Sequence, residues 1–133
     1  MKKLLVLLCI FPLFGFSQCV LGDCNNGTGT SIIESDEYTW IYSGEWKNGT
    51  PHGWGTEIMY DKNGIDMGSH VGNWENGIPN SWGVEVVLDD NGDPTLGTFV
   101  GEWKDGSEDG WGVLIWGKKD IEVGVWKEGE LIE

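Results

Sequence analysis

Arginine is absent from the sequence, and eight lysines stand against 22 acidic residues, which gives a formal net charge of −14. Nucleic-acid binding requires a basic surface, and recognition of anionic lipids requires clusters of basic side chains. The composition therefore argues against nucleic acid as a ligand and against binding to an acidic membrane surface.

Long hydrophobic runs are also scarce. The only one extends from Leu4 to Phe16, which is shorter than the roughly 20 residues that a membrane-spanning helix needs. Lys2 and Lys3 precede it, and small and polar residues follow it as far as Gln18. This layout predicts that residues 1–18 are a secretory signal peptide, with a retained membrane anchor as the alternative. Cleavage would remove two lysines and leave a net charge of 6 − 22 = −16.

Cysteine is limited to three residues, and Cys9 lies within the predicted signal peptide. The remaining pair, Cys19 and Cys24, predicts a short disulfide in an oxidising compartment, so the protein is expected in the periplasm, the cell envelope or the medium. Lipid attachment at Cys19 is the alternative. Gln18 fits that modification poorly, because such a site favours small residues before the cysteine.

Glycine and tryptophan, by contrast, are abundant, with 22 and nine copies, and both recur in a repeated unit. The unit reads Y-S-G-E-W-K-N-G from Tyr42, H-V-G-N-W-E-N-G from His70, F-V-G-E-W-K-D-G from Phe99 and E-V-G-V-W-K-E-G from Glu122. A second half follows the first three copies, as H-G-W-G-T from His52, N-S-W-G-V from Asn80 and D-G-W-G-V from Asp109. Such units must stack, because one unit alone cannot bury its apolar face.

Each unit has the pattern of a β-hairpin. Apolar and polar residues alternate with a period of two, and Asn-Gly or a similar pair follows the first strand of each copy. The extra residues around Asn63-Gly64 and Asn91-Gly92 predict two longer hairpins. We therefore expect an all-β protein. The shortened unit in residues 19–41 is interpreted as an N-terminal cap. The repeat domain follows in residues 42–133 and ends in a half-unit that caps the C-terminal end.

Stacking would arrange the tryptophans in two ladders. The recurring repeat positions predicted to be structural are Gly44, Trp46, Gly72, Trp74, Gly101, Trp103, Gly124 and Trp126. The second ladder holds Trp54, Trp82 and Trp111. The favoured interpretation places the rings in the core of a single-layer sheet. The alternative is an aromatic recognition face formed by Trp54, Trp82, Trp111, Tyr42 and Phe99.

The pattern Y/F-x-G-E-W-K-x-G, followed by G-W-G, resembles the MORN repeat (membrane occupation and recognition nexus). The resemblance covers Tyr42 to Gly129 well and Cys19 to Thr30 weakly. It implies an elongated single-layer antiparallel sheet of stacked hairpins with an aromatic-lined groove. It also implies a scaffold that binds proteins or phospholipids. Ser81 departs from the pattern, because glycine stands at the matching positions 53 and 110.

Catalytic motifs are missing. Only His52 and His70 could serve as a base or bind a soft metal, and neither has a ligand at the required spacing. His70 fills the repeat position of Tyr42 and Phe99, which predicts a packing role. We therefore expect no enzyme, cofactor or metal site, but a binding scaffold with a protein partner. A carbohydrate-binding module and self-association through the sheet edges are the alternatives.

Overall fold

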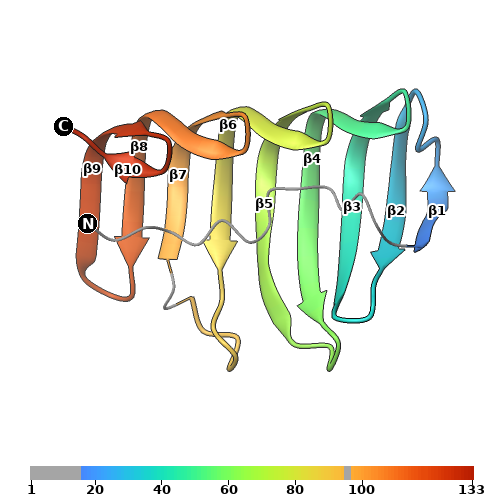
Figure 1. The fold of residues 1–133 in the computed structure, drawn as a ribbon, viewed down its shortest axis with the longest axis horizontal. Coiled ribbons are helices and arrows are strands. Elements are labelled where there is room, and N and C mark those ends of the chain that lie inside the picture. The colour runs from blue at the N-terminus through green and yellow to red at the C-terminus, as the bar shows by residue number, and fades with distance from the viewer. Residues whose placement is uncertain (1–15, 95–96) are drawn as a thin grey trace.

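The computed structural model describes residues 16–94 and 97–133 and shows one open antiparallel sheet, in which the strands follow sequence order (Figure 1). This confirms the predicted fold class. No helix that could cross a membrane occurs within the described residues. The strands are β1 (Phe16–Gly22), β2 (Thr28–Glu34), β3 (Tyr38–Lys47), β4 (Thr50–Asp61), β5 (Asp66–Glu75), β6 (Ile78–Val87), β7 (Gly97–Lys104), β8 (Ser107–Trp116), β9 (Asp120–Lys127) and β10 (Glu130–Leu131).

Tight turns join the two strands of each repeat at one end of the sheet. Both turn residues have positive φ, for example 52° at Asn48 and 74° at Gly49, as the Asn-Gly pairs predict. The turn glycine then donates its N–H to the preceding unit and ties successive hairpins together. These bonds join Gly49 to Asn25, Gly77 to Pro51, Gly106 to Pro79 and Gly129 to Glu108.

The longer predicted hairpins lie at the opposite end of the sheet. The first joins β4 to β5, and the Asp61 side chain accepts hydrogen bonds from the backbone N–H groups of Asn63 and Ile65. In the second, which joins β6 to β7, Asp89 accepts in the same way from Asn91 and Asp93. Gly64 and Gly92 both adopt positive φ. Both insertions are therefore longer connections between neighbouring strands of the same sheet.

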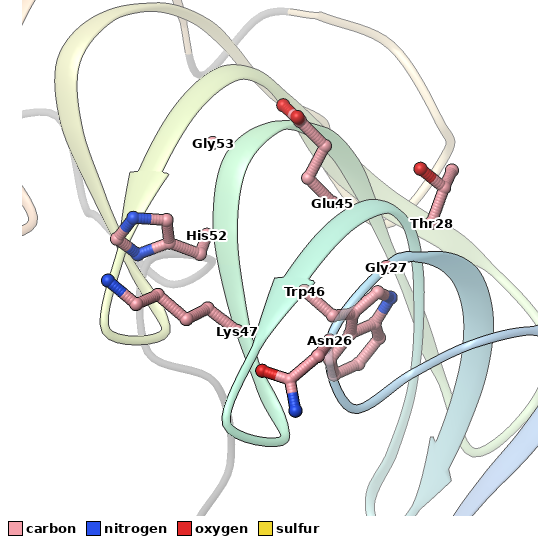
Figure 2. A pocket seen from close by; sticks show the side chains of 8 residues that line it. All are labelled: Asn26, Gly27, Thr28, Glu45, Trp46, Lys47, His52 and Gly53. Atoms are coloured by element: carbon pink, nitrogen blue, oxygen red, sulfur yellow. The ribbon is translucent and has the colours of Figure 1, made fainter.

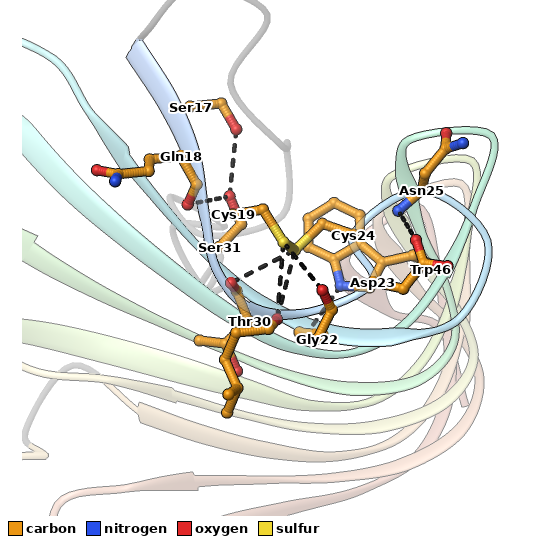
Figure 3. Close-up of a disulfide and its surroundings, with 12 residues drawn as sticks. Ser17, Gln18, Cys19, Gly22, Asp23, Cys24, Asn25, Thr30, Ser31 and Trp46 are labelled. Atoms are coloured by element: carbon orange, nitrogen blue, oxygen red, sulfur yellow. Dashed lines mark hydrogen bonds between the residues drawn. A yellow bond between two sulfur atoms is a disulfide. The ribbon is translucent and has the colours of Figure 1, made fainter.

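The N-terminal segment belongs to the sheet, because β1 pairs with β2 and β2 pairs with β3. The predicted Cys19–Cys24 disulfide is present, with Cys24 packed beside the Trp46 ring (Figure 3). The predicted signal peptide lies mostly outside the described residues, and its last three residues form the start of β1. The predicted boundary at Tyr42 falls inside β3, so the cap and the repeat domain share a strand.

The core covers only one face of the sheet. The turn ends of the strands curl back over this face (Figure 1). Two clusters of buried side chains lie there, one built on Tyr42, Trp46 and Trp74, and the other on Val87, Phe99, Trp103, Leu114 and Trp126. The curl explains how a single layer of strands can enclose large rings without a second sheet.

Candidate functional site

The two tryptophan ladders have opposite environments. Trp46, Trp74, Trp103 and Trp126 are buried, and each indole N–H donates to a glycine carbonyl on the adjacent strand. The acceptors are Gly29, Gly55, Gly83 and Gly112, at 3.0, 3.3, 3.3 and 3.4 Å respectively. Gly29 thus matches Gly55, which fits the interpretation of the N-terminal segment as a shortened unit. Burial with a satisfied N–H makes this ladder part of the core.

Tyr42, His70 and Phe99 fill the gaps between these buried rings. Edge-to-face contacts run from Trp46 through every member to Trp126, with centroids 4.8 to 5.4 Å apart. Tyr42 and Phe99 have no exposed surface. Their assignment to an exposed recognition face is therefore wrong, because their rings lie against Gly55 and Gly112, where a Cβ would overlap them. The predicted packing role of His70 is confirmed.

Trp54, Trp82 and Trp111 are 52%, 45% and 66% exposed, which corrects the expectation that both ladders form the core. They lie on β4, β6 and β8, and they point to the face opposite the core. Since neighbouring strands are about 4.8 Å apart, successive rings recur roughly every 10 Å along the sheet. We call these three rings the ring row.

Carboxylates lie beside two of the three rings. Glu45 accepts a hydrogen bond from the backbone N–H of Trp54, and Glu102 accepts one from that of Trp111, both at 2.5 Å. A Cβ on Gly53 or Gly110 would overlap these carboxylates. The middle unit carries the shorter Asn73 in place of the glutamate.

Ser81 precedes Trp82 in this middle unit, at the position of Gly53 and Gly110, and adopts a φ of 72°. The smaller Asn73 side chain explains why a side chain fits here, but the left-handed backbone still disfavours serine. Ser81→Gly is expected to raise the free energy of unfolding by roughly 1 kcal/mol. Urea unfolding of both proteins measures the change, with Ser107→Gly in β8 as a control that should be destabilising. A loss of stability in Ser81→Gly would contradict this account.

Shallow polar pockets adjoin the ring row on the side of the tight turns. A pocket of ≈ 340 Å³ lies next to Gly53, the residue that precedes Trp54 (Figure 2). Its lining comprises Asn26, Gly27, Thr28, Glu45, Trp46, Lys47, His52 and Gly53. A second pocket of ≈ 220 Å³ is lined by His52, Gly53, Asn73, Trp74, Glu75, Asn80 and Ser81, next to Trp82. Each pocket lies between consecutive turns, so the polar sites follow the repeat.

Two further rows, which were not among the predicted features, cross β2 to β9 on the same face. We call them the outer rows. The first holds Thr30, Ser43, Thr56, Val71, Val84, Val100, Val113 and Val123, and the second holds Ile32, Ile41, Ile58, Ser69, Val86, Thr98, Ile115 and Ile121. None of them is ionisable, although 23% of the chain is charged. The alternation within each strand could have revealed these rows if the strand register had been known.

Ionisable side chains are instead buried in the core. Glu57, His70 and Glu85 occupy one cross-strand row on β4, β5 and β6, and none has exposed surface. Neither oxygen of Glu57 and neither ring nitrogen of His70 has a hydrogen-bond partner. Burial, with a smaller contribution from Glu85, raises the pKa of Glu57 well above its usual value. Burial lowers the pKa of His70 to about 4, so both groups favour their neutral forms.

Protonation of His70 should oppose folding. Because its pKa is lower in the folded state than the ordinary 6.5, its contribution to stability is present above pH 6.5 and is lost as the pH falls towards 4. The wild type should lose roughly 2 kcal/mol of unfolding free energy through His70 between about pH 7 and pH 5. His70→Phe, which introduces the residue found at the equivalent position 99, should not show this loss. Urea unfolding at both pH values measures it, with His52→Phe as the control. Equal pH dependence in His70→Phe and the wild type would contradict the assignment.

No family model matches the chain, and no curated protein matches it. The resemblance to the MORN repeat therefore stays a prediction from the residues between Tyr42 and Gly129. Within residues 16–94 and 97–133, no three His, Cys, Asp or Glu side chains are grouped so that they could hold a metal ion. The ring row combines exposed aromatic surface with adjoining polar pockets on this face.

Proposed function

We propose that the protein is an exported, non-catalytic scaffold of the MORN type that binds a protein partner through the ring row. The supporting observation is that Trp54, Trp82 and Trp111 remain exposed on one face, although the chain buries the four tryptophans of its other ladder. Exposed aromatic side chains in a row are costly to solvate and are enriched where proteins bind one another. The Cys19–Cys24 disulfide supports export, since disulfides persist in oxidising compartments.

The test is the triple variant Trp54→Ala, Trp82→Ala and Trp111→Ala. We expect an unchanged far-ultraviolet circular dichroism spectrum, together with loss of the proteins that the wild type captures from the envelope of its native cells. Leu21→Ala is the matched control, because Leu21 is 70% exposed and lies on β1 outside the ring row. Unfolding of the triple variant would place the rings in the core, and unchanged capture would remove the ring row as the binding surface.

Binding of a linear glycan is the second candidate, and the spacing of the ring row favours it. Rings that recur every roughly 10 Å could stack on alternate sugars of an extended chain. The adjoining pockets offer carboxylate, amide and hydroxyl groups from Glu45, Asn73 and Ser81 for sugar hydroxyls. Glycans of the envelope should then quench tryptophan fluorescence of the wild type and leave the triple variant unaffected. No quenching across the panel would reject this candidate.

A further inference from the structure

The ring row is part of a longer row of side chains that crosses the sheet at the same level. Trp54 lies opposite Asn73 on the adjacent strand, and Trp82 lies opposite Glu102. Side chains that lie opposite each other on paired strands share a face of the sheet. From β3 to β9 the row consists of Glu45, Trp54, Asn73, Trp82, Glu102, Trp111 and Val125. Exposed rings therefore alternate with smaller side chains, and the two acidic ones lie four strands apart.

Both carboxylates are held in place and can still bind a cation. The Oε2 atoms of Glu45 and Glu102 accept the backbone N–H groups of Trp54 and Trp111, and both glutamates are exposed. A carboxylate can accept further hydrogen bonds. A guanidinium or ammonium group placed here would pair with the carboxylate and lie against the neighbouring indole ring. Since the chain has no arginine and a net charge of −14, the complementary positive charge is expected on the partner.

The distance between the rings selects the conformation of such a partner. Strands about 4.8 Å apart place rings on alternate strands roughly 9.6 Å apart. A polyproline II helix rises about 3.1 Å per residue with three residues per turn, so it presents the same side every roughly 9.3 Å. A β-strand does so every roughly 6.7 Å, and an α-helix every roughly 10.5 Å, after seven residues. Across three rings, only the polyproline II helix stays in register to within about 1 Å.

We propose that the ring row binds a proline-rich, basic segment of the protein partner in the polyproline II conformation. Prolines at every third position stack on the three rings, and two arginines six residues apart reach Glu45 and Glu102. Six residues of polyproline II cover about 18.6 Å, which matches the roughly 19 Å from β3 to β7. Such a segment is already extended, so little conformational entropy is lost when it docks on aromatic side chains. The inference rests on the proposed function and adds the chemistry of the partner.

Asn73 makes the centre of the row neutral. It takes the position that glutamate occupies in the two flanking units, and its amide can both donate and accept hydrogen bonds. The backbone of a polyproline II helix has no internal hydrogen bonds, so its carbonyl groups are available to this amide. The expected charge pattern of the segment is therefore basic, neutral, basic. A neutral glycan fits the ring spacing but supplies no cation for Glu45 and Glu102.

Isothermal titration calorimetry of the full chain, as an exporting host processes it, tests the proposal with two synthetic peptides. The peptide R-A-P-A-A-P-R-A-P has the proposed spacing of prolines and arginines and should bind. Its affinity should fall as salt is raised to about 1 M, where the Debye length is about 3 Å. The peptide R-P-A-P-A-P-R-A-A has the same composition with a proline at every second position. It should bind at least about tenfold more weakly.

The protein variant for this test combines Glu45→Gln with Glu102→Gln. Glutamine keeps an oxygen for each backbone N–H, so the sheet should be retained. The variant should raise the dissociation constant of the first peptide about tenfold at low salt and flatten its salt dependence. The control combines Glu34→Gln with Glu37→Gln, two exposed residues outside the ring row that remove the same charge. It should bind like the wild type.

Three results would overturn the proposal. They are no binding of the first peptide at about 1 mM, equal affinity for both peptides, and equal loss of affinity in the two double variants. The first result, combined with fluorescence quenching by a neutral glycan, would assign the ring row to glycans. Envelope capture that requires the rings without peptide binding would keep the proposed function and reject this inference. Peptide binding with capture that does not require the rings would do the reverse.

Discussion

Trp103→Ala is expected to lower the free energy of unfolding by about 3–5 kcal/mol, whereas Trp111→Ala should change it by no more than about 0.5 kcal/mol. Both residues belong to the same repeat. Trp103 is 3% exposed, contacts the rings of His70 and Phe99, and donates its indole N–H to Gly83. Alanine there leaves a large cavity and removes the indole hydrogen bond to the Gly83 carbonyl. Alanine at Trp111 removes mainly exposed surface and keeps the backbone bond to Glu102.

Urea unfolding followed by far-ultraviolet circular dichroism measures both changes without depending on tryptophan emission. Trp74→Ala and Trp82→Ala form a second matched pair, one repeat unit earlier in the chain. Similar losses for the two members of a pair would contradict the separation of the ladders onto opposite faces.

Glu57→Leu is expected to stabilise the protein at neutral pH by about 2 kcal/mol or more. Glu57 is fully buried with no hydrogen-bond partner, and leucine occupies the equivalent position 114 in the third repeat. The pKa of Glu57 is higher in the folded protein than in the unfolded chain, where it is near 4.5. Its contribution to stability is therefore fully present below pH 4.5 and is lost as the pH rises through the folded-state pKa. The gain should therefore be larger at neutral pH than at pH 4.

Glu34→Leu on β2 makes the same change of charge at an exposed strand position and serves as the control. It should have little effect on stability at either pH. Unfolding curves at both pH values distinguish the variants. A gain for Glu57→Leu that is the same at pH 4 and pH 7, or a net destabilisation, would show that the carboxyl group is not buried and unpaired.

Much of the fold follows from local sequence patterns. The Asn-Gly pairs predict the turns because only residues that tolerate positive φ fit there, and Asn48 and Gly49 show this conformation. The recurring Gly-x-Trp unit predicts the stacking, since one unit alone cannot bury its apolar face. The Cys19–Cys24 disulfide follows from the short spacing and the predicted export.

The accessibility of the rings could not be predicted in the same way. The alternation of side chains shows that Tyr42 and Trp46 share one face, but it does not say which face the turns will cover. The turn ends curl over the core face and cover Tyr42 and Phe99, whereas Trp54 lies on the other face and stays exposed. Likewise, the outer rows depend on the register of eight strands, which bulges such as the one between Gly44 and Trp46 shift.

Oxidation of the folded protein by N-bromosuccinimide, with peptide mass spectrometry to locate the modified rings, tests the central claim most directly. That claim is that one tryptophan ladder forms the core and the other forms an accessible recognition surface. The account predicts that Trp54, Trp82 and Trp111 are oxidised first, while Trp46, Trp74, Trp103 and Trp126 react only after unfolding. Oxidation of the second set as fast as the first would contradict it.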